Sequence, residues 1–436
     1  MALGGGTFIA QNKVLPGTYI NVVSAVSASR ELSDRGIAAI GVTGGWGKTG
    51  EIFEVTSEDL QKNSLSVFGY SYDSEELKNL RELFAHARIV YCYRLDGGGV
   101  KAQNTYAVAK YPGTKGNSIK TVITVNADDD GKYDVATVYG TRTVDTQKGV
   151  ASAAELVSND WADFKAGASL SATAGESMTG GTDSDVTGEA HQAFLDALES
   201  YSFNALGCVS AESTIKALYA NYCKRLRDEM GKKFQVVVQG YAADYEGVVN
   251  VKNTVTDSGA TGAELVYWVT GVIAGTNVNA SASNALYDGE YSVNTQFTQS
   301  QLETAIKNGE FAFHKVGADV RVLTDINSLV TTSDTKGDIF KKNQTIRVVD
   351  QIANDIAVIF NDNYLGTVPN DSAGRAALKN DIVDHHNSLQ RIRAIEGFDD
   401  GNITVERGSD ATSVVVTDEV TVINSMEKLY MTVTVS

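Results

Sequence analysis

Residues 204–241, NALGCVSAESTIKALYANYCKRLRDEMGKKFQVVVQGY, decide the predicted fold, because they read as a strand, a helix and a returning strand. The first strand is NALGCVS, and the returning strand is KFQVVVQGY at 233–241. Between them, apolar side chains recur at helical spacing, and Gly231 marks the end of the helix. The residues on this helix face are Ile215, Leu218, Tyr219, Tyr222, Leu226 and Met230. A strand–helix–strand unit of this kind is typical of an α/β core.

A second strand–helix–strand unit is predicted over residues 65–95. LSVFGY is apolar and aromatic, which favours a strand, and RIVYCYRL at 88–95 is the returning strand. Asp73 and Glu76 make a capping box for the helix between them. Its apolar face holds Leu77, Leu80 and Phe84.

Residues 98–188 interrupt the two units with a different pattern. Short β-rich runs, TYAVAKY, IKTVITV and KYDVATVY, alternate with glycine and acidic turns such as Asp128-Asp129-Asp130-Gly131. The far end of this segment, GESMTGGTDSDVTGE, is polar, so we expect an exposed loop there. The pattern predicts an inserted β domain on the outer surface, whose removal leaves a folded remainder.

The last part of the chain reads as two helices followed by strands. The apolar positions are Ile346, Val349, Ile352, Ile356 and Ile359 in the first helix, and Leu378, Ile382, Leu389 and Ile392 in the second, which Gly397 stops. NITVER at 402–407 and SVVVTDEVTVI at 413–423 flank Gly408-Ser409-Asp410 and predict a hairpin. The chain ends in LYMTVTV, which alternates as a strand does, and TYINVVS at 18–24 mirrors it near the start.

With a third core helix at 299–308, opened by a Thr298/Gln301 capping box, these segments predict a multidomain protein of α/β and α+β class. An α/β core carries an inserted small β domain, and a C-terminal domain of two helices and a β-hairpin follows it. The expected boundaries are an N-terminal arm 1–28, the core in two parts at 29–97 and 189–343, the inserted β domain 98–188, the C-terminal domain 344–424 and a C-terminal arm 425–436.

Charge and composition exclude several classes of protein. Lys and Arg number 37 against 54 Asp and Glu, and the net charge of −17 repels nucleic acid and acidic membranes. No apolar run approaches the roughly 20 residues of a membrane-spanning helix, and MALGGGTFIAQNK has neither the basic nor the apolar region of a secretory signal. We therefore expect the chain to fold in the cytoplasm where it is made. Cys92, Cys208 and Cys223 fit reduced thiols better than disulfides or a zinc site.

No constellation of residues predicts catalysis, a metal ion or a cofactor. GGWGKTG at 44–50 contains the Gly-Lys-Thr of a phosphate-binding loop, but position 42 is Val where that loop requires Gly, so we predict a glycine-rich surface loop. His385 and His386 lie near two aspartates, yet neighbours on a helix point about 100° apart and would not converge on one ion. We expect an exposed polar helix face there instead. Acidic pairs such as Asp399-Asp400 read as solvated turns.

The two chain ends carry the more informative signal. A terminal strand with no partner adjacent in sequence can pair within its own subunit or complete the sheet of another, and both arrangements remain open. The glycine-rich lead-in Gly4-Gly5-Gly6 and the polar link 424–428 weaken the case for strands that stay within their own subunit.

At these same segments the sequence resembles the contractile tail sheath proteins of myophages and phage-tail-like bacteriocins, particularly those of Gram-positive hosts. The resemblance rests on GGTFIAQNKVLPGTYINVVS at the start, YPGTKGNSI in the insertion, YSFNALGC at 201–208 and SMEKLYMTVTVS at the end. It spans essentially the whole chain. It implies a structural subunit, not an enzyme, that polymerises as stacked hexameric rings around a tail tube and contracts to drive the tube through a cell envelope.

The resemblance also implies which residues make contacts between subunits. Both terminal arms are expected to cross to neighbouring subunits and add strands to a sheet there. The N-terminal arm matches Thr18, Tyr19, Ile20, Asn21, Val22 and Val23; the C-terminal arm matches Leu429, Tyr430, Met431, Thr432, Val433, Thr434 and Val435; the acceptor hairpin matches Ile403, Val405, Val414 and Val416. The basic residues expected to face the tube are Arg375, Lys379, Arg391 and Arg393.

The implied partners are further copies of the chain, the tail tube protein, and the baseplate and tail terminator proteins. Assembly is expected in the cytoplasm of the bacterial host, and the product is part of a virion tail or of a released phage-tail-like particle. Two other classes stay open on the sequence alone: another self-assembling surface or adhesion protein, and a cytosolic α/β enzyme whose site forms only in the fold. Only a sheath forms tubular polymers of uniform width, so electron microscopy distinguishes the three.

Overall fold

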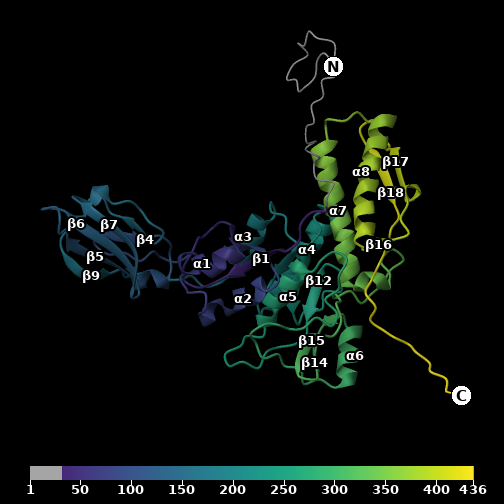
Figure 1. The fold of residues 1–436 in the computed structure, drawn as a ribbon, viewed down its shortest axis with the longest axis horizontal. Coiled ribbons are helices and arrows are strands. Elements are labelled where there is room, and N and C mark those ends of the chain that lie inside the picture. The colour runs from purple at the N-terminus through teal and green to yellow at the C-terminus, as the bar shows by residue number, and fades with distance from the viewer. Residues whose placement is uncertain (1–31, 436) are drawn as a thin grey trace, which may run out of the picture. The chain divides into compact units, whose positions relative to one another are not determined.

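The computed structural model describes residues 32–435, and Figure 1 shows its helices and strands. The predicted strand TYINVVS, which holds the N-terminal arm residues, lies outside the described residues. The chain divides into two compact units. The main unit comprises Asp34–Asn354 and the chain from Val422 onward, and the helix–hairpin unit comprises Asp355–Thr421 together with the segment that ends at Ser33.

A seven-stranded sheet forms the centre of the main unit, with strand order β13-β12-β11-β10-β1-β3-β2. The inner strand β1 (Ile37–Val42) pairs in parallel with β10 (Ala205–Gly207) and with β3 (Ile89–Arg94). The remaining strands are β11 (Gln235–Gln239), β12 (Val248–Val251) and β13 (Glu310–Phe311), which continue the parallel sheet, and β2 (Phe53–Thr56), which is antiparallel to β3. The strands predicted near 88–95, 204–210 and 233–241 are confirmed, and they meet in this sheet.

Helices cover both faces of the sheet, so its strands are buried on two sides. One face packs against α2 (Lys78–Phe84) and α5 (Glu264–Gly275), and Trp268 of α5 is fully buried there. The other face packs against α3 (Gly188–Leu198) and α4 (Ser213–Asp228). The predicted helix after residue 210 is therefore confirmed as α4, although Met230 lies beyond its end.

The predicted helix at 299–308 is confirmed as α6 (Gln299–Lys307), and the capping box of Thr298 and Gln301 opens it as expected. A small antiparallel hairpin, β14 (Phe313–Val316) and β15 (Asp319–Val322), follows.

One predicted strand is wrong. LSVFGY lies largely within α1 (Ser57–Phe68), because Thr56 and Asp59 form a capping box that starts a helix, and Leu60 and Phe68 are buried on one face of it. The predicted capping box at Asp73 and Glu76 is also wrong. The chain forms a short 3₁₀ helix, Glu75–Leu77, before α2, and its N-cap residue makes no side-chain capping bond. The apolar composition of LSVFGY fits a strand as well as a helix, so the capping box upstream of it determines that the segment is helical.

The inserted segment forms two antiparallel sheets. One has the order β7-β6-β5-β9, and the other pairs β4 with β8. The strands are β4 (Ala107–Ala109), β5 (Ile119–Val125), β6 (Tyr133–Tyr139), β7 (Arg142–Val150), β8 (Ala162–Phe164) and β9 (Thr173–Ser177). Trp161, Ile119 and Met178 pack in its core together with Trp46 from the glycine-rich loop.

The segment GESMTGGTDSDVTGE was expected to be an exposed loop, and this prediction is right for most of its residues and wrong at its start and at a few positions. Its start belongs to β9, and Met178 is only 1% exposed. Asp183 accepts a hydrogen bond at 3.3 Å from the guanidinium of Arg94, whose side chain is itself 1% exposed. Polar composition misleads only at these positions, because backbone pairing and a buried arginine satisfy the polar groups there.

The glycine-rich loop GGWGKTG is likewise more than a surface loop. Trp46 is 2% exposed, and its ring N–H donates to the Ser66 carbonyl at 3.0 Å. The backbone N–H groups of Gly44 and Gly45 donate to one carboxylate oxygen of Asp96 at 2.9 and 3.2 Å. Two of the N–H groups that would help to cradle a phosphate in a true P-loop are therefore bonded to a carboxylate of the same chain.

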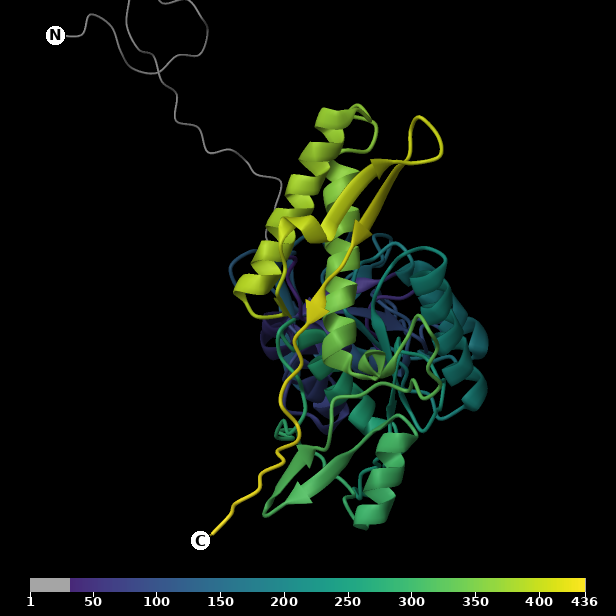
Figure 2. The ribbon, with the colours of Figure 1, turned by 90° about the vertical axis from the view of Figure 1, so that its right-hand side faces the viewer.

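The helix–hairpin unit is built from α8 (Ser372–Arg391), the end of α7 (Asn343–Asn363) and the strands that follow. These strands are β16 (Ile395–Glu396), β17 (Ile403–Arg407), β18 (Val414–Asp418) and the short β19 (Thr421–Val422). The predicted hairpin is confirmed as β17 and β18, which Figure 2 shows beside α8. α8 ends at Arg391 and not at Gly397, because Arg393 already has a left-handed φ of 62°.

Candidate functional site: the C-terminal segment and the exposed hairpin

Residues 423–427 form an extended segment that side chains of α7 hold against the main unit. The Gln344 amide donates to the Ile423 carbonyl at 3.1 Å, and its oxygen accepts from the Ser425 N–H at 2.9 Å. Asn424 donates to the Thr345 hydroxyl at 3.0 Å. A glutamine that contacts backbone on both sides in this way fixes the position of the segment without a strand partner. We call residues 423–427 and the side chains that bind them the anchor.

Glu427 ends the anchor with three bonds to its carboxylate. It accepts from the Ser283 hydroxyl at 2.6 Å and from the Thr324 hydroxyl at 3.2 Å, and it forms an ion pair with Lys342. Burial acts to raise the pKa of Glu427, but the Lys342 and hydroxyl hydrogen bonds outweigh it and lower the pKa below its ordinary value. The anchor therefore depends on an ionised carboxylate.

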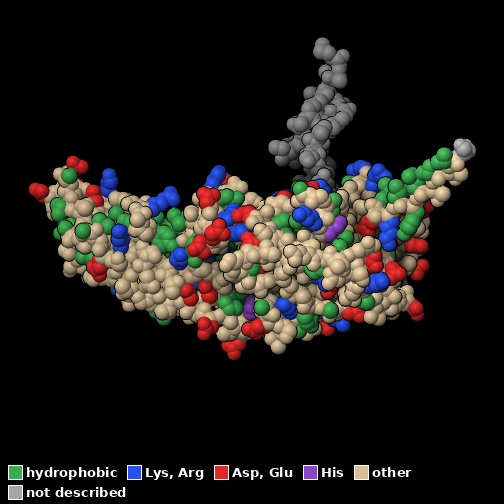
Figure 3. Space-filling model, turned by 90° about the horizontal axis from the view of Figure 1, so that it is seen from below, with side chains coloured by type: hydrophobic (Ala, Val, Ile, Leu, Met, Phe, Trp, Pro, Cys, Tyr) green, Lys and Arg blue, Asp and Glu red, His purple; other side chains and the backbone are tan. Residues whose placement is uncertain are grey.

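Beyond Lys428 the chain is exposed and alternates as a strand. Leu429 is 85% exposed, Tyr430 88% and Val435 89%, and Figure 3 shows hydrophobic side chains along this end of the chain. Between 423 and 435 the described chain has no strand pairing. A run of exposed apolar residues with strand-like alternation is a surface that favours pairing with another chain.

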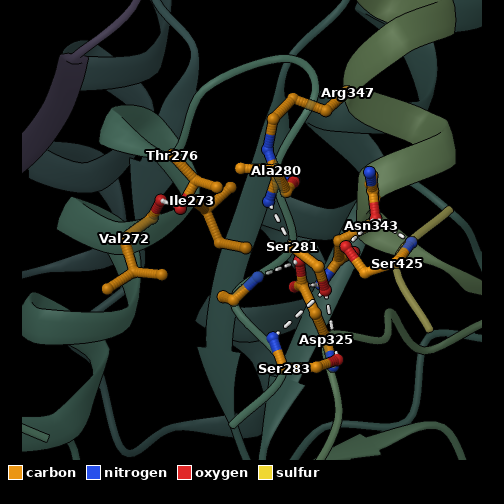
Figure 4. Close-up of polar contacts among 12 residues, drawn as sticks. Val272, Ile273, Thr276, Ala280, Ser281, Ser283, Asp325, Asn343, Arg347 and Ser425 are labelled. Atoms are coloured by element: carbon orange, nitrogen blue, oxygen red, sulfur yellow. Dashed lines mark hydrogen bonds and ion pairs between the residues drawn. The ribbon is translucent and has the colours of Figure 1, made fainter. Parts of the chain in front are cut away.

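A buried network beneath the anchor fixes the first turns of α7. Arg347 and Asp325 have side chains that are each 1% exposed, and they form an ion pair at 3.1 Å. Asn343 donates to the other Asp325 oxygen at 2.8 Å, and Arg347 also donates to the Ala280 carbonyl at 2.7 Å. Figure 4 shows these side chains converging on Asp325. Because Gln344 lies on the same turns, this network also sets the position of the anchor.

The hairpin places the predicted acceptor residues on one face. Ile403 pairs with Asp418 and Val405 with Val416, and the α8-facing side of the hairpin carries Ile403, Val405, Val414 and Val416. Ile403 is fully buried, whereas Val416 is 38% and Val415 on the opposite face is 53% exposed. Among residues 32–435, β17 and β18 have no further strand partner. Their outer edges therefore present unpaired backbone N–H and C=O groups.

The predicted exposed face at His385 and His386 is wrong, because both side chains are fully buried. His385 Nε2 lies 3.0 Å from Asp355 of α7, and His386 Nε2 lies 2.9 Å from Asp418 of β18. Adjacent helix positions point in different directions, so each ring reaches a different neighbouring element. A sequence pattern gives no sign of these two partners, which are about 30 residues away in both directions along the chain.

The four predicted tube-facing basic residues do not form one stripe. Arg375 and Lys379 are half-buried on α8, and Arg375 donates to the Asn370 carbonyl and side chain. Arg391 is exposed and lies roughly 160° around the helix from Arg375, at 3.6 residues per turn. Arg393 lies beyond the end of α8 and is exposed.

Over the part of the chain that the structure describes, no group of three or more His, Cys, Asp or Glu side chains is placed to hold a metal ion. In that same range, no helix is long and apolar enough to cross a membrane. Cys92, Cys208 and Cys223 are buried free thiols, and burial raises the pKa of Cys208 to about 11.

Four protein-family models match the chain in order. Their descriptions are tail sheath protein Gp18 domain III N-terminal region (residues 35–95), phage tail sheath protein beta-sandwich domain (97–183), phage tail sheath protein central domain (184–328) and phage tail sheath C-terminal domain (335–436). The architecture is thus that of a tail sheath subunit, with the β-sandwich model falling on the inserted segment.

Individual proteins agree with these models. Phage-like element PBSX protein XkdK of Bacillus subtilis is 33% identical, over 100% of each chain. The crystal structure of a sheath tail protein from Desulfitobacterium hafniense is 35% identical, with a TM-score of 0.81 over 95% of this chain and 99% of that one. The contracted helical sheath of the anti-feeding prophage shares the fold at 12% identity, with a TM-score of 0.58 over 97% of this chain and 99% of that one.

The chain belongs to the phage tail sheath protein family. It is a structural subunit of a contractile tail sheath, as the resemblance in the sequence predicted. The anchor was not predicted, because the polar link 424–428 reads as a simple spacer when its partners on α7 are unknown.

Proposed function

We propose that this chain polymerises as stacked hexameric rings around a tail tube, and that the polymer contracts to drive the tube through a cell envelope. The observation that carries the proposal is the C-terminal segment. Residues 429–435 are exposed and alternate as a strand does, and residues 423–427 just before them are held on their own subunit. The hairpin β17–β18 of another copy offers the open edge that such a strand requires.

The C-terminal arm, Leu429 to Val435, adds a strand to the hairpin of a neighbouring copy. A strand of this length makes on the order of six backbone hydrogen bonds, each worth about 0.5–1.5 kcal/mol net. Each arm therefore contributes several kcal/mol to one contact between subunits. The N-terminal arm, Thr18 to Val23, is proposed to do the same on the strength of the family resemblance.

The anchor sets where the arm leaves its subunit. An arm that starts at a fixed point and crosses a short exposed link searches a small volume, so its effective concentration at the neighbouring hairpin is high. Lys428, the one residue between the anchor and the arm, acts as a hinge that lets the bodies of the subunits move while the strands remain paired. The arms thus keep the lattice connected during contraction.

Contraction in this proposal uses no nucleotide. An extended lattice that is kinetically trapped above the contracted one releases energy without a chemical step. The Asp96 carboxylate supports this point, because it occupies the Gly44 and Gly45 N–H groups of the loop that most resembles a phosphate-binding loop.

The proposal also covers the outer surface of the polymer, its contact with the tube and its two ends. The inserted β domain, 98–188, lies on the outside of the polymer, and basic residues of α8, among them Arg391 and Arg393, face the tube. Baseplate and tail terminator proteins bound the two ends of the sheath. Assembly takes place in the bacterial host cytoplasm, and the product is a virion tail or a released phage-tail-like particle.

Electron microscopy of the purified full chain tests the proposal. We expect tubular polymers of uniform width with helical symmetry built from six-fold rings. Flat sheets or fibres of variable width would instead indicate another kind of self-assembling surface protein. A chain that stays monomeric over a wide range of concentration and salt would contradict the proposal.

Glu427→Gln is expected to loosen the anchor and leave the main unit folded. The amide cannot form the ion pair with Lys342, and hydrogen bonds to charged groups are worth about 1.5–3 kcal/mol. Because every 1.4 kcal/mol is about tenfold, amide hydrogen exchange at residues 424–428 should become about ten- to a hundredfold faster. Glu419→Gln, at an exposed glutamate, is the matched control and should leave this exchange unchanged.

The same anchor should weaken in acid. The pKa of Glu427 is lower in the folded chain than in the unfolded chain, so its stabilisation is complete above the unfolded value and is lost as the pH falls through the folded value. Exchange at 424–428 in the natural chain, corrected for its intrinsic pH dependence, should therefore rise on acidification, and Glu427→Gln should lack this component. Identical pH profiles for the two proteins would show that Glu427 does not hold the anchor.

A further inference from the structure

A continuous chain of hydrogen-bonding groups runs through the helix–hairpin unit. The Ser33 hydroxyl donates to Asp355 at 2.5 Å, and the other Asp355 oxygen lies 3.0 Å from His385 Nε2. The Nδ1 atoms of His385 and His386 are 3.4 Å apart, and His386 Nε2 lies 2.9 Å from Asp418. We call Ser33, Asp355, His385, His386 and Asp418 the histidine latch. It links the segment before β1, α7, α8 and β18.

The acceptors around His386 determine its protons. Nδ1 lies 2.9 Å from the Ile382 carbonyl, which can only accept, and Nε2 lies 2.9 Å from Asp418, which can only accept as an ionised carboxylate. Each ring nitrogen must therefore carry a hydrogen, which makes His386 an imidazolium. A buried cation of this kind is stabilised by the carboxylate that pairs with it.

His385 then has to be neutral. Its Nε2 faces the Asp355 carboxylate, which already accepts from Ser33, so Nε2 carries the hydrogen. Its Nδ1 faces the Nδ1–H of His386 and can only accept, because two N–H groups directed at one another at 3.4 Å would repel. The two rings together hold three protons and one positive charge between two carboxylates.

We propose that the histidine latch holds β18, and the segment leading to β1, against α7 and α8, and that the strength of this contact depends on the protons of the two rings. With three ring protons every contact is favourable. Loss of a proton leaves a ring lone pair against Asp418 or the Ile382 carbonyl, and gain of a fourth sets two N–H groups against each other. The hairpin is therefore held most firmly in a window of pH, and loosens on either side of it.

The surroundings of the pair are consistent with this role. The charged groups that bond to it are Asp355 from α7 and Asp418 from β18, and the ring of Phe398, centred 5.0 Å from that of His386, covers it with an apolar surface. Both imidazoles have side chains no more than 1% exposed, so water cannot replace a lost partner without an opening of the unit. The histidine latch acts within one chain. It adds to the proposed strand exchange, because it makes the stability of the proposed acceptor hairpin depend on pH.

Nuclear magnetic resonance of the full chain labelled with ¹⁵N-histidine tests the proton count. The chain has five histidines, so the ring signals can be assigned by substitution. At neutral pH we expect both ring nitrogens of His386 and only Nε2 of His385 to be protonated. A His386 ring with one unprotonated nitrogen at neutral pH would overturn the proposal. This result is read from the natural protein, in which no residue of the latch is substituted.

Amide hydrogen exchange at β18, corrected for its intrinsic pH dependence, tests whether the latch holds β18 in place in a way that depends on pH. We expect the slowest exchange where the two rings together hold three protons, and at least about tenfold faster exchange where the latch gains or loses a proton, which corresponds to about 1.4 kcal/mol. His386→Gln should remove this dependence, and His314→Gln, on β14, should retain it. A pH-independent rate in the natural chain would overturn the proposal. Since both measurements concern a single chain, their failure would leave the strand-exchange proposal intact.

Discussion

Removal of residues 429–436 is expected to abolish polymerisation and to leave a folded monomer. The described part of this segment contacts no strand of its own chain, so its loss costs the subunit little stability. The same loss removes the several kcal/mol of backbone hydrogen bonding proposed for each contact between subunits. Sedimentation and electron microscopy measure assembly, and circular dichroism with thermal unfolding measures whether the monomer is intact.

A single substitution makes the same test without shortening the chain. Thr432→Pro removes one backbone N–H from the middle of the arm and cannot take part in a strand ladder, so it should prevent assembly. Thr432→Val keeps the N–H and favours a strand, and should assemble as the natural chain does. Normal sheaths from the truncated chain or from Thr432→Pro would show that the arm does not hold the lattice.

Asp325→Ala is expected to destabilise the main unit by about 3–5 kcal/mol, because it leaves Arg347 buried without its charged partner. The substitution also removes the acceptor for the Asn343 amide and for the Ala282 N–H, which bonds to Asp325 at 2.9 Å. Denaturation of the unassembled chain by urea measures the effect. The start of α7 should loosen as well, with loss of protection at the anchor.

Asp338→Ala is the matched control for this experiment. Asp338 pairs with Lys341 at 2.9 Å, but its side chain is 87% exposed, and exposed ion pairs contribute about 0–1 kcal/mol. Equal losses of stability from Asp325→Ala and Asp338→Ala would mean that burial of the Asp325 network does not matter.

The sequence predicted the core of the fold because local pattern and tertiary environment agree there. KFQVVVQGY has three consecutive valines at its centre, and the structure buries them as β11 between two layers of helices. The capping box of Thr298 and Gln301 needs only neighbours within one turn, so it is legible in the sequence and present in α6.

The failures have two causes: a local cap that was overlooked, and contacts with residues that are distant in the sequence. LSVFGY is helical because of a local signal that the prediction missed, the Thr56/Asp59 capping box upstream of it. Within the mostly exposed polar run after β9, Asp183 is bound by Arg94, which lies 89 residues away in the sequence. His385 and His386 have polar side chains, and only the positions of Asp355 and Asp418 make their burial favourable. The same holds for the candidate site. The alternating pattern of the arm is visible in the sequence, but the anchor that holds the start of the arm is not, because its partners on α7 are distant in the sequence.

Cross-linking between two chains that each carry one added cysteine tests the central claim of strand exchange most directly. One chain carries Val415→Cys on β18, and the other carries Met431→Cys or Thr432→Cys on the arm, since successive strand residues point to opposite faces. The three natural cysteines are buried and should not react. Oxidised polymers assembled from an equal mixture are predicted to yield dimers with one chain of each kind. Absence of such dimers, together with a link inside single chains when both cysteines are placed in one chain, would contradict strand exchange.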